Sequence, residues 1–112
     1  MAYKHIRADD TESLDLGGIV LQNLFSESGA PFSVSKVALK GDQKESMNSE
    51  SDIAYYVLDG NGSFFIGSDE IQVKQGDLIY IPKGTRYRDQ GNLSLLAIAC
   101  PRFNAQNHTY FD

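Results

Sequence analysis

Residues 76–84 of the chain read Gly-Asp-Leu-Ile-Tyr-Ile-Pro-Lys-Gly. The apolar run from Leu78 to Ile81 is typical of a β-strand, and it directly follows a Gly-Asp turn signal. Pro82 ends the strand because proline cannot donate a hydrogen bond to a neighbouring strand. The stretch therefore predicts a short strand between two glycine turns.

Short apolar runs alternate with turn signals along most of the chain. We expect strands over residues 17–26, 32–40, 53–58, 63–66, 70–74, 78–81 and 93–100. Helical periodicity is nearly absent, so the pattern predicts an all-β fold of antiparallel strands, closed as a jelly roll. The Asp-Gly-Asn-Gly sequence at 59–62 predicts a hairpin turn. A change in the inward-facing positions of residues 32–40 predicts a β-bulge near Lys36.

The length of 112 residues fits one domain and is too short for two. We expect a single domain over residues 1–112, with an N-terminal arm over 1–15, a barrel over 32–103 and a tail over 104–112. Because an exposed pair of aromatic side chains is unfavourable, Tyr110 and Phe111 predict that the tail packs back against the body or against a partner.

The formal net charge of −5 argues against nucleic acid and anionic membranes as partners, since phosphate binding requires a basic surface. The single cysteine, Cys100, cannot form an internal disulfide, and its apolar neighbours predict that it is buried. No signal peptide and no run long enough to span a bilayer is evident. We therefore expect a cytoplasmic protein.

Two motifs resemble those of the cupin family. Residues 76–84 are similar to the family's second motif, G-x5-P-x-G-x2-H-x3-N, and Tyr-Val-Leu-Asp-Gly at 56–60 is similar to the end of the first, G-x5-H-x-H-x3-E-x6-G. Both motifs stand in register, counted from Gly41 and Gly76. The resemblance covers about residues 32–103 and implies the cupin fold, a double-stranded β-helix of antiparallel strands.

The resemblance also implies where the family's metal ligands would lie. The four ligand positions hold Met47, Ser49, Ile53 and Tyr87. A thioether, a hydroxyl, an alkyl group and a phenol replace the three imidazoles and the carboxylate that suit a transition metal. We therefore expect no metal site and no cofactor.

These positions instead predict a pocket for an organic molecule. If Ile53 points into the barrel, Tyr55 does so too, because side chains alternate along a strand. The expected lining is Met47, Ser49, Ile53, Tyr55 and Tyr87, which is mostly apolar with a few hydroxyls, as in small-molecule sites. Arg86 and Arg88 could bind a carboxylate or phosphate of the ligand, or form surface ion pairs with neighbours such as Asp89.

Three functions remain open. The first is metal-independent binding of a small organic molecule. The second is a metal-free isomerase, epimerase or lyase acting on a sugar or small acid, with Tyr55 or Tyr87 donating a proton and Glu45 or Glu50 accepting one. The third is a structural or protein-interaction role, which predicts a filled barrel and an exposed apolar patch.

Two further expectations come from the resemblance. Small cupins commonly form homodimers, and we expect the segment from Ile19 to Phe25 at that interface. Metal-free relatives that act on nucleotide sugars use a histidine base with a tyrosine acid. The two histidines of this chain, His5 and His108, both lie outside the motifs, so no histidine base is expected from the barrel itself.

Overall fold

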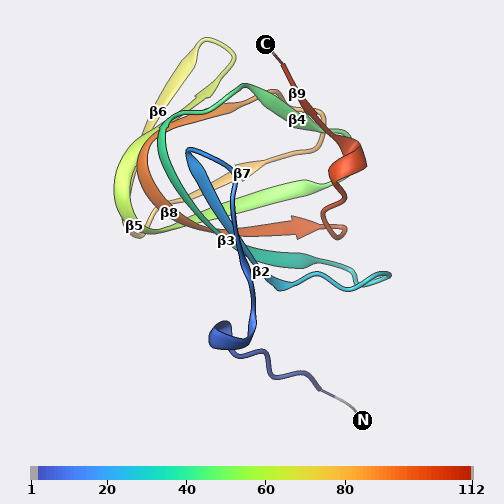
Figure 1. Cartoon of the computed structure of the whole chain (residues 1–112). Helices are drawn as coiled ribbons and strands as arrows, with labels where there is room; N and C mark the ends of the chain where they lie inside the picture. Colours follow the sequence, from blue (N-terminus) through green and yellow to red (C-terminus); the bar gives the residue numbers. More distant parts are fainter. Residues whose placement is uncertain (1–2, 112) are drawn as a thin grey trace.

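The computed structural model describes residues 3–111, and over this range the chain forms a β-barrel with no α-helix (Figure 1). The described strands are β1 (Ser13–Asp15), β2 (Ile19–Phe25), β3 (Ser33–Asp42), β4 (Ser46–Asn48), β5 (Asp52–Ile66), β6 (Asp69–Lys74), β7 (Leu78–Ile81), β8 (Arg88–Cys100) and β9 (His108–Tyr110). Two short 3-10 helices are η1 (Ala8–Asp10) and η2 (Ala105–Asn107). None of the helices described within residues 3–111 is long and apolar enough to cross a membrane.

The strands form one large sheet and one small one, and all of their pairings are antiparallel. The large sheet has the order β1-β2-β3-β8-β5-β6, and β7 also pairs with β5. The small sheet contains β4 and β9. Figure 1 shows the large sheet curling round on itself, with β4 and β9 beside one another at one end. This arrangement confirms the predicted all-β, antiparallel jelly roll.

The predicted hairpin at residues 59–62 is wrong, because β5 runs through this segment without a turn. Its glycines instead allow β5 to lie against β8. A Cβ atom at Gly60 would lie 2.0 Å from the carbonyl oxygen of Asn92, and one at Gly62 would lie 2.2 Å from that of Gln90. Any larger residue would therefore clash with the neighbouring strand at both positions.

The predicted bulge near Lys36 is also wrong. Strand β3 pairs with β8 in unbroken register, and the irregularity lies on β2, between Asn23 and Phe25. The sequence pattern was misleading because the inner face of β3 begins with Ser33 and Ser35, so the first apolar residues of the segment point outward. These two serines line a pocket.

Two expectations about the end of the chain have opposite outcomes. Cys100 is exposed, so the prediction that it is buried is wrong. Strand β8 is apolar on both faces, and Cys100 lies on the outer one while its neighbour Ala99 is buried. The tail does pack back on the body, because β9 pairs with β4.

Candidate functional site

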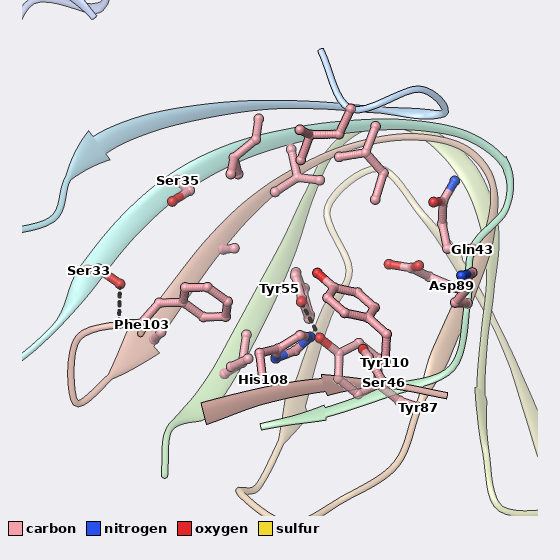
Figure 2. Close-up of a pocket in the computed structure, with 18 of the residues that line it drawn as sticks. Ser33, Ser35, Gln43, Ser46, Tyr55, Tyr87, Asp89, Phe103, His108 and Tyr110 are labelled. Carbon is pink, nitrogen blue, oxygen red and sulfur yellow. Dashed lines mark hydrogen bonds between the residues drawn. The ribbon is translucent and has the colours of Figure 1, made fainter. Parts of the chain in front are cut away.

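A pocket of about 520 Å³ opens inside one end of the barrel (Figure 2). The inner face of the large sheet carries small side chains there, Ser33, Ser35, Ala97 and Ala99. The inner positions further along β3 and β8, together with those of β5, hold large residues that form the buried core, and these include Leu39, Leu95, Val57 and Phe64. The volume is typical of a small-molecule site. The filled barrel that a purely structural role predicts is therefore not what this chain forms.

Two tyrosines meet at the boundary between core and pocket. The hydroxyl oxygens of Tyr55 and Tyr87 lie 2.6 Å apart, a hydrogen-bond distance. Both rings pack near Phe64, with centroid distances of 5.5 Å and 6.4 Å. Because one hydroxyl donates to the other, only one of the two hydroxyl protons takes part in this bond.

Burial keeps both phenols protonated. It raises the pKa of Tyr55 well above its usual value, and the neighbouring Tyr87 adds to this rise. Burial also raises the pKa of Tyr87 to about 12, against the opposing effect of the hydrogen bonds with Tyr55 and Ser46. At neutral pH the pair is therefore a hydrogen-bond donor and a proton source.

Asp89 brings a carboxyl group into the same pocket (Figure 2). Burial raises its pKa to about 6, although its backbone hydrogen bond and the charge of Arg88 work in the opposite direction. At neutral pH a carboxyl group with this pKa is mostly ionised, and a small fraction of it is protonated. Asp89 is therefore the carboxyl group of this pocket, and a raised pKa of this kind is common at functional sites.

His108 and Tyr110 reach the pocket from the tail. They lie on β9, and their ring centroids are 5.1 Å apart. The His108 ring also packs against Phe103, at 5.2 Å, and faces Tyr87 at 6.5 Å. Its imidazole is half-buried, and burial lowers its pKa. This end of the pocket is therefore aromatic and carries a neutral imidazole.

The structure places three of the predicted lining residues in the pocket: Ile53, Tyr55 and Tyr87. Met47 and Ser49 do not line it. In β4 the buried positions are Ser46 and Asn48, so Met47 between them faces the other way. That the three lining residues bind a ligand stays a prediction.

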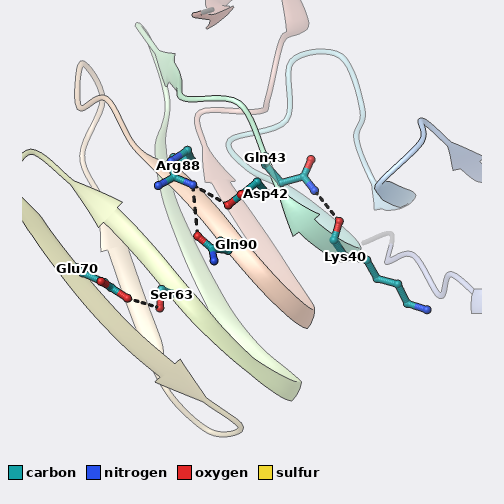
Figure 3. A network of polar contacts seen from close by, with 7 residues as sticks. All are labelled: Lys40, Asp42, Gln43, Ser63, Glu70, Arg88 and Gln90. Carbon is teal, nitrogen blue, oxygen red and sulfur yellow. Dashed lines mark hydrogen bonds and ion pairs between the residues drawn. The ribbon is translucent and has the colours of Figure 1, made fainter.

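The two arginines also lie outside the lining, and both form ion pairs at the surface. Arg86 donates to the Glu45 carboxylate at 2.7 Å and stacks on the ring of Phe111 at 3.7 Å. Arg88 donates to Asp42 at 2.8 Å (Figure 3). Of the two readings of these arginines, the contacts favour surface ion pairs, but Arg88 pairs with Asp42 rather than with its neighbour Asp89.

Neither carboxylate expected as a proton acceptor reaches the pocket. Glu45 pairs with Arg86, and Glu50 is exposed. Asp52, in the same acidic stretch, accepts the backbone N–H of Lys83. Sequence reasoning missed Asp89 as the pocket carboxylate, although alternation from Tyr87 would have pointed to it. It also undervalued His108, because no local pattern shows that the tail folds over the barrel.

The ligand set of a metal-binding cupin does not fit this site. Over residues 3–111 no group of three or more His, Cys, Asp or Glu side chains is arranged to hold a metal ion. The side chains at the family's ligand positions, Met47, Ser49, Ile53 and Tyr87, do not form a nitrogen and oxygen donor set.

Residues 35–93 match the model of the cupin domain. The chain belongs to the cupin family. This cupin is 32% identical to an uncharacterized protein of Aquifex aeolicus over 74 residues. The matched region covers 63% of this chain and 61% of that protein. It is also 36% identical to an uncharacterized protein of Methanocaldococcus jannaschii over 52 residues. That matched region covers 45% of this chain and 42% of the relative. The chain therefore spans less than two thirds of the length of either relative.

The solved structures that resemble this cupin include an enzyme. Pac13 from Streptomyces, described as a unique nucleoside dehydratase, has a TM-score of 0.87 and 26% identity over 99% of this chain and 92% of its own. A variant of Pac13 with a tyrosine changed to phenylalanine has been solved with uridine, with a TM-score of 0.88 and 25% identity over the same shares. KdgF from Halomonas sp. has a TM-score of 0.81 at 15% identity, over 92% of this chain and 99% of its own, and this shows the fold alone.

Proposed function

We propose that this cupin binds a small uncharged molecule in the barrel pocket and acts on it as a metal-independent lyase. The observation that carries the proposal is the pairing of two kinds of group in one pocket. Asp89 has a pKa raised to about 6, and Tyr55 and Tyr87 have pKa values raised so far that they stay protonated. Because the pKa of Asp89 lies far below those of the tyrosines, we assign Asp89 as the base and the tyrosine pair as the acid.

The roles fit an elimination of water. The Asp89 carboxylate accepts a proton from a carbon atom of the substrate, and the neighbouring C–O bond breaks. The leaving hydroxide takes a proton from the Tyr55–Tyr87 pair, so one water is lost and a double bond forms. Transfer of the proton from Asp89 back to the tyrosine pair restores the starting state. The reaction requires no redox change.

The likeness to Pac13 supports the same reaction class and suggests the ligand class. Pac13 is described as a nucleoside dehydratase and has been solved with uridine in variants that alter a tyrosine or a histidine. The pocket of this chain is lined by the aromatic rings of His108 and Tyr110 and by the hydroxyl-bearing pair Tyr55 and Tyr87. A nucleoside, with a planar ring and a hydroxylated sugar, suits this combination.

The proposal is tested with chelator-treated protein, uridine and a panel of nucleosides and sugars that carry a carbonyl beside a C–H group. We expect uridine binding by calorimetry, and for the substrate the loss of one water by mass spectrometry. The rate should rise with pH through about 6, as Asp89 ionises. Asp89→Asn should lower it by about 100-fold or more while uridine binding persists.

Asp59→Asn is the matched control, because Asp59 is an exposed aspartate outside the pocket. Activity that survives Asp89→Asn, or that disappears on chelation, would overturn the lyase assignment. Uridine binding without any turnover across the panel would instead favour the simpler function, a metal-independent binding protein.

We also propose that this cupin acts without a metal, forms a homodimer and lies in the cytoplasm. A single cysteine suits a reducing compartment. The interface expected over Ile19–Phe25, which is β2 in the structure, stays a prediction. A second candidate surface is the outer face of β5, β7 and β8, where Tyr56, Leu78, Tyr80 and Ile98 are exposed. A second copy would cover these apolar side chains.

A further inference from the structure

His108 has one ring nitrogen held by the protein. On the β4–β9 sheet Asn48 and His108 stand directly opposite one another. The Asn48 side-chain nitrogen lies 3.3 Å from Nδ1 of His108. The other ring nitrogen, Nε2, has no hydrogen-bond partner among the contacts of residues 3–111.

Two backbone groups fix the orientation of the Asn48 amide. Its Oδ1 accepts the N–H of Glu50 at 3.0 Å and the N–H of Ser51 at 2.7 Å. A side-chain oxygen is the only atom of this amide that can accept these bonds, so the NH₂ group must face His108. Asn48 is 3% exposed, and the orientation is therefore enforced away from competing water.

The Asn48 amide in turn fixes the tautomer of His108. An NH₂ group can only donate, so Nδ1 must be the acceptor and carry no proton. A neutral imidazole with a bare Nδ1 has its hydrogen on Nε2, on the opposite side of the ring from β4. Burial, which lowers the pKa of His108, favours this neutral ring.

We propose that Asn48 locks His108 as the Nε2–H tautomer, so that the tail end of the pocket presents one fixed hydrogen-bond donor to an acceptor oxygen of the ligand. The inference rests on the proposed function for the identity of the pocket. It deepens that function by naming the ligand class, an uncharged ring-bearing molecule with a carbonyl or other acceptor oxygen. His108 is then a residue that positions the ligand and selects for it, and the proton transfers remain with Asp89 and the tyrosines.

The tautomer is tested by long-range proton–nitrogen NMR on labelled protein without ligand. The chain has two histidines, so in the His5→Gln variant all imidazole signals come from His108. We expect an unprotonated Nδ1 and a protonated Nε2 at slightly alkaline pH. A protonated Nδ1, or an average of the two tautomers, would overturn the proposal on its own.

Asn48→Asp provides the matched perturbation. A carboxylate keeps an oxygen for the N–H groups of Glu50 and Ser51 and places an acceptor beside Nδ1. We expect Nδ1 to become protonated in this variant, and an unchanged His108 spectrum would contradict the lock. The spectrum of the native chain decides the question even where this variant does not fold.

Uridine serves as the probe for the ligand contact. His108→Phe keeps a ring but removes the donor, and we expect it to weaken uridine binding by about 3- to 10-fold. His108→Gln, whose amide nitrogen reaches about as far as Nε2, should recover most of the loss. Equal binding by the native chain and His108→Phe would overturn the contact. If the native chain binds no uridine, the proposed ligand class fails, while the NMR result still decides the tautomer.

Discussion

The hydroxyl oxygens of Tyr55 and Tyr87 lie 2.6 Å apart at the inner end of the pocket, and Tyr87 is 4% exposed. The two groups come from β5 and from the loop just before β8, so their meeting depends on how these elements are paired. Tyr87 is buried, and its hydroxyl therefore has little water to replace its partner. The contact therefore contributes to stability as well as to the site.

Tyr87→Phe tests this double role. The change leaves the Tyr55 hydroxyl without its buried partner, and we expect it to lower the free energy of unfolding by about 1–2 kcal/mol. Because Tyr87 contributes to the raised pKa of Tyr55, the pKa of Tyr55 should fall. Urea unfolding and titration of phenolate absorbance measure the two effects. Tyr3→Phe, at an exposed position, should change neither, and an unaltered Tyr55 titration in Tyr87→Phe would contradict the contact.

Asp89 predicts an unusual dependence of stability on pH. Its pKa in the folded chain is about 6, against 3.8 for a free carboxyl. Between these values the folded state binds more protons than the unfolded state, so the contribution of Asp89 to the free energy of unfolding falls as pH rises through this window. Asp89→Asn removes the buried charge, and we expect it to stabilise the protein at pH 8 by about 2–3 kcal/mol.

Urea unfolding at pH 8 and below pH 4 checks this prediction. The gain in stability should vanish at the lower pH, where the carboxyl is protonated in both states. Asp59→Asn, at an exposed site, should leave stability within about 0.5 kcal/mol at both pH values. A destabilised Asp89→Asn variant at pH 8 would show that the ionised carboxylate is held by favourable contacts.

Substitutions at Gly62 and Gly29 compare two reasons for which a glycine is required, close packing against a neighbouring strand and a positive φ. A Cβ atom at Gly62 would lie 2.2 Å from a carbonyl oxygen of β8, whereas Gly29 has a φ of 81° and nothing within 4 Å of such an atom. We expect Gly62→Ala to lower the free energy of unfolding by about 3 kcal/mol or more. Gly29→Ala should cost only about 1–2 kcal/mol from its positive φ. Thermal unfolding compares the two, and equal losses would contradict the close approach of β5 and β8.

The apolar outer face predicts the oligomeric state. Leu78 and Tyr80 are 61% and 56% exposed, and they lie opposite Tyr56 and Ala54 of β5. We expect a dimer in sedimentation velocity and a monomer for Leu78→Lys, because a buried charge without a partner is unfavourable. Asp69→Lys, at the start of β6 after the tight turn, should stay dimeric. A monomeric native chain, or a dimeric Leu78→Lys, would rule out this interface.

The sequence predicts the strands and the barrel well, because glycine turns and β-branched runs act locally. The segment from Leu78 to Ile81 was predicted to the residue. The Asp-Gly-Asn-Gly segment predicts a turn, but its glycines instead allow close contact with a distant strand. Whether a glycine is needed for its φ or for its missing side chain depends on the partner strand, and no local pattern contains that information.

The site was predictable only in part for the same reason. Tyr55 and Tyr87 follow from alternation within strands and from the spacing of the motifs. His108 lines the pocket because β9 pairs with β4, about sixty residues away in the chain. Asp89 is expected from the sequence as a surface partner for arginine, whereas in the structure Arg88 pairs with Asp42 and Asp89 lines the pocket.

The tail is fastened to the barrel at several points. The N–H of Phe103 donates to Ser33, the hydroxyl of Ser51 donates to the carbonyl of Pro101, and the N–H of Phe111 donates to the carbonyl of Glu45. It thus adds an aromatic wall to the pocket from outside residues 35–93, the part that matches the family. The pocket is therefore lined by two parts of the chain, the family barrel with Tyr55, Tyr87 and Asp89, and a tail with His108 and Tyr110 that lies beyond the family match. A change in the tail would alter one wall of the pocket and leave the barrel motifs intact.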